Sequence, residues 1–158
     1  MKKVIFSLML LAGVLLAFSS CDKKSLSHTG DETGNLYGIW KLERKAVTVG
    51  ENTTDTDYSD VNFYLALSNL GVPHALAKKG SLSGFDLKDV DVDGSLFTYN
   101  ADKKQISFDK QLWLSEGLTY SMELKGIYDV LELTSQTLVI HQKNLLGVSE
   151  VYSFRKVK

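Results

Sequence analysis

Three aspartates at alternate positions form the pattern in this chain that is most similar to a metal site. Asp89, Asp91 and Asp93 are followed by Gly94, which matches the opening of a calcium loop, where carboxylates alternate and a glycine allows a sharp turn. The match then ends, because Asn100 stands where that loop supplies a bidentate glutamate, and the two residues between the acids are valines. We therefore expect a strand with its acids in solvent and a hairpin turn at Asp93 and Gly94, with calcium as the alternative.

Residues for other site chemistry are few. The segment from Leu36 onward holds two histidines, His74 and His141, and these need carboxylates from distant positions to complete a closed zinc site. The chain has no Gly-x-Ser-x-Gly, His-Glu-x-x-His or glycine-rich phosphate motif, so a nucleophile with its base is not indicated. The sequence predicts a protein that is not an enzyme and that needs no cofactor.

Composition and charge narrow the class of protein. Of 158 residues, 44% are hydrophobic and 23% are charged, and 18 basic residues offset 19 acidic ones. A chain of this kind can bury a core, and its even charge balance predicts no basic face for a phosphate backbone. We expect a single folded domain and no nucleic-acid partner.

The first twenty residues are predicted to be a signal peptide. Lys2 and Lys3 precede an apolar run from Val4 to Phe18, which is about as long as a signal-peptide core and shorter than the roughly 20 residues of a membrane span. Phe18-Ser19-Ser20-Cys21 follows and resembles the lipobox of bacterial lipoproteins, in which small residues precede an invariant cysteine. The resemblance implies cleavage before Cys21 and a thioether-linked lipid on its sulfur.

A lipid on Cys21 would hold the protein to a membrane of the cell envelope, with the outer membrane as the expected location and the leaflet left open. The resemblance implies several acyl chains, such as palmitate, which anchor stably because each buried methylene contributes about 0.8 kcal/mol. An ordinary signal peptidase could instead cleave nearby and leave Cys21 free. Residues 21–35 are polar apart from Leu26, and we expect a flexible tether with a reach of about 20 Å.

From Leu36 to Lys158 apolar and polar residues alternate, which is typical of strands with one buried face. Gly126 is expected to bend the longest strand, and a parity shift after Val130 predicts a bulge there. Pro73 to Lys79 predicts one short helix, since proline suits a first helical turn and Gly80 follows the last. The expected strands are 40–46, 61–68, 96–99, 105–109, 118–133, 137–143 and 148–157, and residues 50–60 are expected to be a polar turn.

About eight strands with short connections favour an antiparallel meander, and closing the meander into a barrel removes exposed strand edges. Three further features stand out in this segment: Gly38-Ile39-Trp40, Leu133-Thr134 with Thr137 to Ile140, and Tyr152-Ser153-Phe154-Arg155-Lys156. With these features the sequence resembles the small lipocalin-like lipoproteins of Gram-negative bacteria, many of them domains of unknown function. The resemblance implies an all-β, roughly eight-stranded barrel over residues 36–158, with Trp40 closing one end beneath a basic side chain, for which Arg155 is the candidate.

An eight-stranded barrel is just wide enough either to be filled by side chains or to hold one small ligand. Inward-facing large residues would form a packed core, or would line a pocket for a hydrophobic or amphipathic molecule with tyrosine hydroxyls as polar anchors. The residues that strand parity places inside are Trp40, Phe63, Leu65, Tyr120, Met122, Tyr128 and Phe154.

Two functions follow from these alternatives. A barrel with a pocket would make the chain a lipid-anchored envelope protein that binds a small hydrophobic or amphipathic ligand. A fully packed barrel would instead dock on an envelope protein, for which Leu112-Trp113-Leu114, expected beyond a strand end, could supply a contact patch or serve as a cap.

Overall fold

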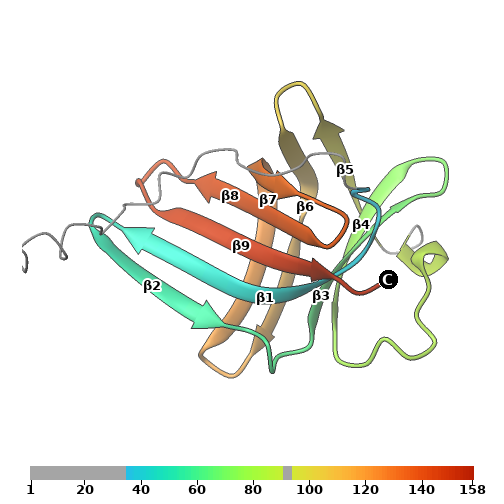
Figure 1. Cartoon of the computed structure of the whole chain (residues 1–158), viewed down its shortest axis with the longest axis horizontal. Helices are drawn as coiled ribbons and strands as arrows, with labels where there is room; N and C mark the ends of the chain where they lie inside the picture. The colour runs from blue at the N-terminus through green and yellow to red at the C-terminus, as the bar shows by residue number, and fades with distance from the viewer. Residues whose placement is uncertain (1–34, 91–93) are drawn as a thin grey trace, which may run out of the picture.

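A closed antiparallel barrel forms the described part of the protein. The computed structural model describes residues 35–90 and 94–158, and nine strands within these ranges join in one sheet (Figure 1). The sheet closes because β1 (Gly38–Val49) pairs with β9 (Ser149–Lys156) on one side and with β3 (Phe63–Asn69) on the other. The all-β, eight-stranded barrel expected from the sequence is confirmed. The predicted signal peptide, Cys21 and nearly all of the tether lie outside the described residues.

Eight of the strands within the described ranges form a simple meander around the barrel, in the order β1-β3-β4-β5-β6-β7-β8-β9. Each strand hydrogen-bonds to the next one along this path, so the connections can be short. The strands not yet given are β4 (Pro73–Lys79), β5 (Ser95–Asn100), β6 (Gln105–Glu116), β7 (Tyr120–Leu133) and β8 (Thr137–Lys143).

The ninth strand, β2 (Asn52–Asp57), lies in the segment that was expected to be a turn. It pairs with the second half of β1, from Arg44↔Asp57 to Val49↔Asn52, while the first half of β1 pairs with β3. The β1–β2 hairpin therefore extends past the barrel wall (Figure 1). Almost all side chains of β2 are exposed, so no apolar alternation marks this strand in the sequence.

The helix predicted over residues 73–79 is wrong, because this segment is β4. Its residues pair with the whole of β3, from Phe63↔Lys79 to Asn69↔Pro73. Pro73 takes the first position of the strand, where the missing N–H is tolerated. Pairing with a strand that is buried along nearly its full length outweighs the high helix propensity of the alanines, leucine and lysines, because tertiary context overrides propensity.

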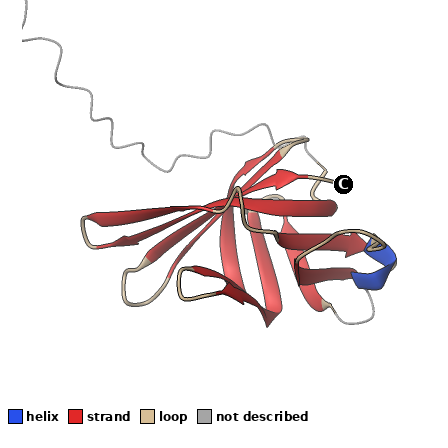
Figure 2. Cartoon of the chain, turned by 90° about the horizontal axis from the view of Figure 1, so that it is seen from below, coloured by secondary structure: helices blue, strands red, loops and turns tan. Residues whose placement is uncertain are grey.

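A second, smaller core covers the outside of the barrel. The connection from β4 to β5 folds back so that Phe85 and Val90 pack against Ile39, Tyr64 and Ala66 on the outer face of β1 and β3. The connection contains a short helical turn, η1 (Leu87–Asp89), drawn in blue in Figure 2. Because β3 is thus covered on both faces, it is a continuous buried run rather than a half-exposed strand.

Local irregularities allow the long strands to curve around the barrel. Gly126 in β7 has a φ of 78°, a left-handed value that glycine adopts without strain, and the register between β7 and β8 shifts between Val130 and Glu132. The predicted bend and bulge are therefore confirmed. The strand itself begins at Tyr120 rather than Leu118, which is fully exposed in the preceding turn.

β1 contains a bulge that the sequence analysis missed. Its register against β9 shifts between Leu42 and Arg44, which makes Glu43 an extra residue on this strand. A one-residue insertion reverses the faces of all later residues. Lys45, and not Ala46, is therefore the buried residue, and this reversal places a charged side chain inside the barrel.

Candidate functional site

Large side chains pack the middle of the barrel. Ring centroids are 6.4 Å apart for Phe97 and Phe108, 6.0 Å for Phe108 and Tyr128, 6.2 Å for Tyr128 and Tyr152, and 6.4 Å for Tyr152 and Phe154. Aromatic rings are in contact at these separations. The rings thus form a continuous path through the space that a ligand in the lumen would occupy.

All of the residues that strand parity placed inside the barrel are found there. Tyr120 is partly buried and packs against the main core cluster. The other predicted residues are buried members of that cluster: Trp40, Phe63, Leu65, Met122, Tyr128 and Phe154. Their mutual packing makes them core residues.

Two buried tyrosine hydroxyls bind the backbone of β7. The Tyr58 hydroxyl donates to the carbonyl oxygen of Ser121 at 2.9 Å and accepts the N–H of Ser121 at 3.0 Å. The Tyr128 hydroxyl donates to the Glu123 carbonyl oxygen and accepts the Lys125 N–H, both at 3.2 Å. Burial raises the pKa of Tyr58, and it raises the pKa of Tyr128 to about 12. These hydroxyls hold the bent strand in place. Because each already donates and accepts a backbone hydrogen bond, neither serves as an anchor for a ligand.

An ion pair lies inside the barrel beside these tyrosines. Lys45 Nζ is 3.2 Å from Glu150 Oε1, and the Lys45 side chain is only 11% exposed. The same ammonium is 5.0 Å from the centre of the Tyr152 ring, and the Tyr152 hydroxyl is 3.0 Å from Glu150 Oε2 and 3.0 Å from the Glu123 carbonyl oxygen. Burial and then the charge of Glu150 raise the pKa of Tyr152. The bulge at Glu43 creates this cluster, so strand parity alone could not reveal it.

The basic side chain over Trp40 is Lys156, so the prediction of Arg155 for this position is wrong. Lys156 Nζ is 4.9 Å from the Trp40 ring, and Trp40 Nε1 donates to the Leu36 carbonyl oxygen at 2.8 Å. Arg155 has the opposite parity and forms an exposed ion pair with Glu43 at 3.1 Å. Burial lowers the pKa of Lys156, which is consistent with its position against the indole.

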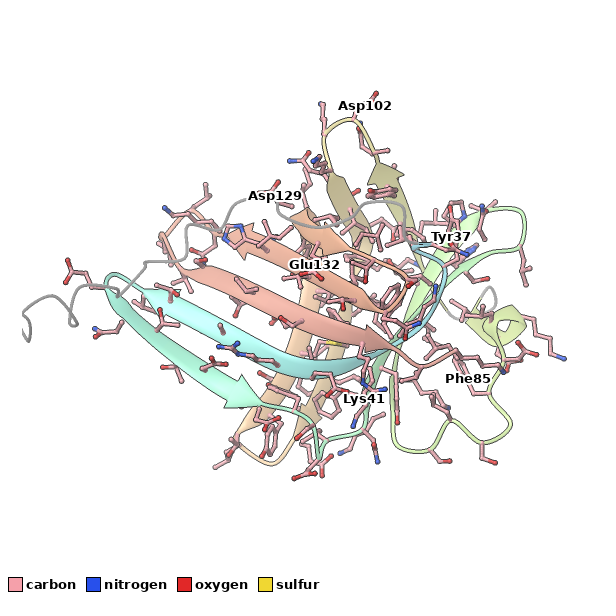
Figure 3. The ribbon with its side chains drawn as sticks, in the orientation of Figure 1. Tyr37, Lys41, Phe85, Asp102, Asp129 and Glu132 are labelled. Atoms are coloured by element: carbon pink, nitrogen blue, oxygen red, sulfur yellow. The ribbon has the colours of Figure 1, made fainter. Side chains whose placement is uncertain are left out.

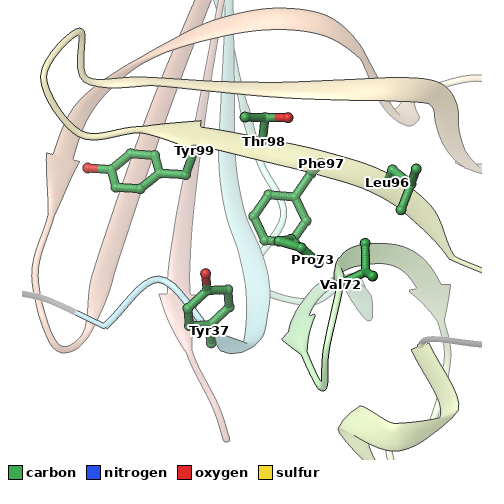
Figure 4. Close-up of a pocket in the computed structure, with 7 residues that line it drawn as sticks. All are labelled: Tyr37, Val72, Pro73, Leu96, Phe97, Thr98 and Tyr99. Carbon is green, nitrogen blue, oxygen red and sulfur yellow. The ribbon is translucent and has the colours of Figure 1, made fainter.

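An open pocket of about 410 Å³ lies where the first strand begins. Its walls come from the entry to β1, the β3–β4 turn and β5, and its lining residues are Tyr37, Val72, Pro73, Leu96, Phe97, Thr98 and Tyr99 (Figure 4). The ladder between β4 and β5 consists of His74↔Leu96 and Ala75↔Ser95. β5 then continues beyond the first residue of β4, and the pocket occupies the space past that point.

The pocket is well suited to a small molecule with an apolar body. Its volume lies within the roughly 300 to 1,000 Å³ that is usual for ligand pockets. Tyr37 lies at the entry to the barrel (Figure 3), its ring centroid is 6.2 Å from that of Phe97, and its hydroxyl accepts from Asn69 Nδ2 at 3.3 Å. Sequence analysis missed this site because three segments far apart in the chain build it. The aromatic residues beside Gly38 and in β5 were the available signal.

A second open pocket, of about 450 Å³, lies on the outside of the β1–β2 hairpin. It is lined by Glu43, Arg44, Asp55 and Asp57, and Arg44 forms an ion pair with Asp55. Hydrogen bonds from the backbone and side chain of Ser59 lower the pKa of Asp57. All four of these lining residues are charged, and Glu43 pairs with Arg155, so the pocket offers little to an apolar ligand.

The calcium candidate is only partly within the described residues. Asp91 and Asp93 lie outside them, and Asp89 belongs to η1, where its carboxylate accepts the N–H of Asp86 at 2.8 Å and caps the turn. The solvent-facing strand predicted at Asp89 is therefore wrong. Across residues 35–90 and 94–158 no group of three or more His, Cys, Asp or Glu side chains is placed to hold a metal ion.

The Leu112-Trp113-Leu114 triplet lies within β6 rather than beyond a strand end. Leu112 is buried and Leu114 partly buried, while Trp113 points outward and is mostly exposed. The alternation is that of a strand with one face in the core. The triplet therefore does not cap the barrel, and Trp113 alone contributes to the outer surface.

Family models, curated proteins and solved structures were compared with the chain. None of them matches it. Within the described ranges, none of the helical segments has the length and apolar character that crossing a bilayer requires.

Breaking the internal ion pair should destabilise the fold. Lys45→Met leaves Glu150 without its cation, and we expect the free energy of unfolding to fall by about 2 kcal/mol. Adding Glu150→Gln should recover part of the loss, because the two changes act on one interaction. Urea denaturation of the single and double variants measures this. Arg155→Met, which removes an exposed pair, is the control and should cost less than about 0.5 kcal/mol; purely additive losses would contradict the coupling.

Alkaline pH should destabilise the barrel through its buried tyrosines. An unfolded tyrosine loses its proton near pH 10, whereas Tyr128 holds its proton until about pH 12. Its folded pKa is raised, so its contribution is intact below pH 10 and is lost as the pH rises through 12. The loss amounts to about 2 to 3 kcal/mol. Urea midpoints measured across this range should fall, and Tyr128→Phe should make the decline shallower than in the unchanged protein.

Proposed function

We propose that this protein is a lipid-anchored envelope protein that binds a small hydrophobic or amphipathic molecule, without catalysis, in the pocket beside Tyr37. The observation that carries the proposal is the open, largely apolar pocket of about 410 Å³ at the start of β1. The site differs from the barrel lumen that the sequence suggested, because the aromatic path occupies the lumen. The proposed type of ligand is the one expected from the sequence, and the proposed site is the pocket instead of the lumen.

The chemistry of the pocket favours a ligand with an apolar body and a small polar group. Val72 and Leu96 offer aliphatic surface, and Phe97 is a buried core residue that supports the pocket from below. Hydroxyl groups come from Tyr37, Thr98 and Tyr99. The hydrogen bond from Asn69 and the contact with the Phe97 ring orient Tyr37 toward the pocket, and orienting a lining residue in advance lowers the entropic cost of binding.

The proposal includes the lipid on Cys21 and a place among the small lipocalin-like lipoproteins of Gram-negative bacteria, in the outer membrane. The lipobox-like sequence before Cys21, the closed eight-stranded barrel and the cation of Lys156 over Trp40 support it. The lipid is the only attached group proposed, and the binding step requires no cofactor.

The second candidate is a packed barrel that docks on an envelope protein. It is favoured by two leucines at the β8–β9 turn, Leu145 and Leu146, which are 106% and 89% exposed. The Asn144 side chain accepts the N–H groups of Leu146 and Val148 at 2.9 and 3.0 Å, so the turn is held in a conformation that presents both leucines to solvent. A protein surface with a matching apolar groove would cover them.

Filling the pocket should abolish ligand binding. Thr98 lines the pocket and is exposed, so Thr98→Trp places an indole in the open space at a position where a strand tolerates it. We expect the affinity for anilinonaphthalene sulfonate, an amphipathic fluorescent probe, to fall at least about tenfold, a loss of ~1.4 kcal/mol. Fluorescence titration measures this affinity. Any small molecule that co-purifies with the unchanged protein in native mass spectrometry should be missing from the Thr98→Trp variant.

The matched control for this test is Thr54→Trp, which places the same side chain at an exposed strand position on β2, away from the pocket lining. Its probe affinity should equal that of the unchanged protein. Equal affinity of all three proteins would exclude the pocket as the binding site. A protein partner crosslinked through the Leu146 region, together with the absence of probe binding, would favour the docking candidate.

The lipid anchor is tested by Cys21→Ala. The variant has no thiol to accept diacylglycerol, so it should incorporate no labelled palmitate and should keep its signal peptide, which gel mobility reports. Ser25→Ala, in the expected tether, should be labelled and processed normally. Incorporation of label by the Cys21→Ala protein would rule out attachment at this residue.

A further inference from the structure

We propose that the end of the barrel where the tether joins lies on the lipid surface, with Leu70, Val72 and Leu96 in the boundary between headgroups and acyl chains. We call this end the tether end and define it by Tyr37, residues 69–73 and Leu96. The inference goes beyond ligand binding and rests on the lipid anchor of the proposed function. Its occupant is a bilayer surface and not a second protein.

Three aliphatic side chains at the tether end are exposed and close together. Leu70 is 64% exposed, Val72 53% and Leu96 44%. Leu70 and Val72 belong to the tight turn between β3 and β4, and His74↔Leu96 pairing brings the start of β5 beside that turn. Val72 and Leu96 line the same pocket, and Leu70 is two residues before Val72 in the turn, so all three expose apolar surface at this end of the barrel.

Aromatic residues with polar tips flank the aliphatic ones. Tyr37 and Tyr99 line the pocket together with Val72 and Leu96, and Asn69 Nδ2 donates to the Tyr37 hydroxyl. Tyrosine rings are enriched at membrane–water interfaces, where the ring lies among acyl chains and the hydroxyl among headgroups. The combination matches the chemistry of a lipid surface better than that of bulk water.

The position of the anchor selects this end of the molecule. The described chain begins at Asn35, two residues before Tyr37, and the Asn35 carbonyl oxygen accepts from Lys156 Nζ at 2.7 Å. Cys21 precedes Asn35 by 14 residues, and the flexible tether expected there has a reach of ~20 Å. The anchor therefore keeps the tether end near the bilayer at high effective concentration.

The exposed leucines at the other end of the barrel lie beyond that typical reach. β1 has 12 residues and so spans about 40 Å from its start to its tip. In Figure 1 the start of β1 and the β3–β4 turn lie on one side of the molecule, and the tips of the β1–β2 and β8–β9 hairpins lie on the other. Leu145 and Leu146 thus share the chemistry of the tether end without its proximity to the anchor, which makes them the natural control.

The test uses the full, lipidated protein in vesicles of phosphatidylcholine and phosphatidylglycerol. Cys21 is the only cysteine, and its sulfur is blocked once lipid is attached, so Leu70→Cys and Leu146→Cys each introduce one reactive thiol. Each variant is labelled with an environment-sensitive nitrobenzoxadiazole dye and quenched with nitroxide-bearing lipid. We expect several-fold stronger quenching and a blue-shifted emission for the dye at position 70, with little of either at position 146.

Several outcomes would overturn the inference. In protein that co-floats with vesicles, equal quenching at both positions would show that lipid contact is not particular to the tether end. No quenching at either position would show that the tether end does not rest on lipid while the anchor stands. Protection of the dye at position 70 that requires an envelope extract and is missing in purified vesicles would assign this surface to a protein. Failure of the protein to co-float with vesicles would instead contradict the lipid anchor of the proposed function. Probe binding that Thr98→Trp abolishes would still support the pocket in each case.

Discussion

Closure of the barrel through β1 is the constraint on which the rest of the structure depends. β1 pairs with β9 along most of its length, from Trp40↔Lys156 to Thr48↔Ser149, and on its other side it is shared between β3 and β2. A strand with partners on both sides leaves no open edge in the wall. The bulge at Glu43 lets β1 satisfy both neighbours while it curves, and it turns Lys45 inward. The polar cluster of Lys45, Glu150 and Tyr152 is thus a result of closure.

The two ends of the barrel are closed in different ways. At one end Trp40 is buried beneath Lys156, and its indole N–H bonds the backbone of Leu36. Further along β1, an ion pair and tyrosine hydroxyls take the place of an apolar plug. Buried charges need partners, and Glu150 serves Lys45 and Tyr152 together. Aromatic rings pack between these two regions, and the pocket beside Tyr37 lies where β1 begins.

The sequence predicts the fold well where strands are regular and half-buried. Trp40, Met122 and Phe154 were placed inside correctly because alternation holds in the parts of the strands around them. The bend at Gly126 was predicted because glycine often marks such positions. The bulge at Glu43 carries no comparable residue type, so regular alternation along β1 does not reveal that Lys45 is buried. β2 was missed because both of its faces are in solvent and show no alternation. β4 was predicted to be a helix because alanine, leucine and lysine favour helices, whereas its strand conformation depends on pairing with β3, which composition does not reveal.

The pocket was beyond sequence reasoning for a related reason. Its walls are residues 37, 72–73 and 96–99, and their proximity follows from where β4 happens to begin relative to β5. Strand parity assigns a residue to a face, but it does not give the stagger between neighbouring strands, which decides where a wall ends. The aromatic residues could be read from the sequence, but their proximity in the fold could not.

The ladder between β4 and β5 has a consequence for motion. Two residue pairs join these strands, whereas β3 and β4 are joined by seven, so separating β4 from β5 breaks few hydrogen bonds. Local opening with a low free-energy cost starts at the weakest part of a structure. Thermal breathing of the barrel therefore begins beside the pocket, and it can enlarge the entrance while the rings behind it stay packed.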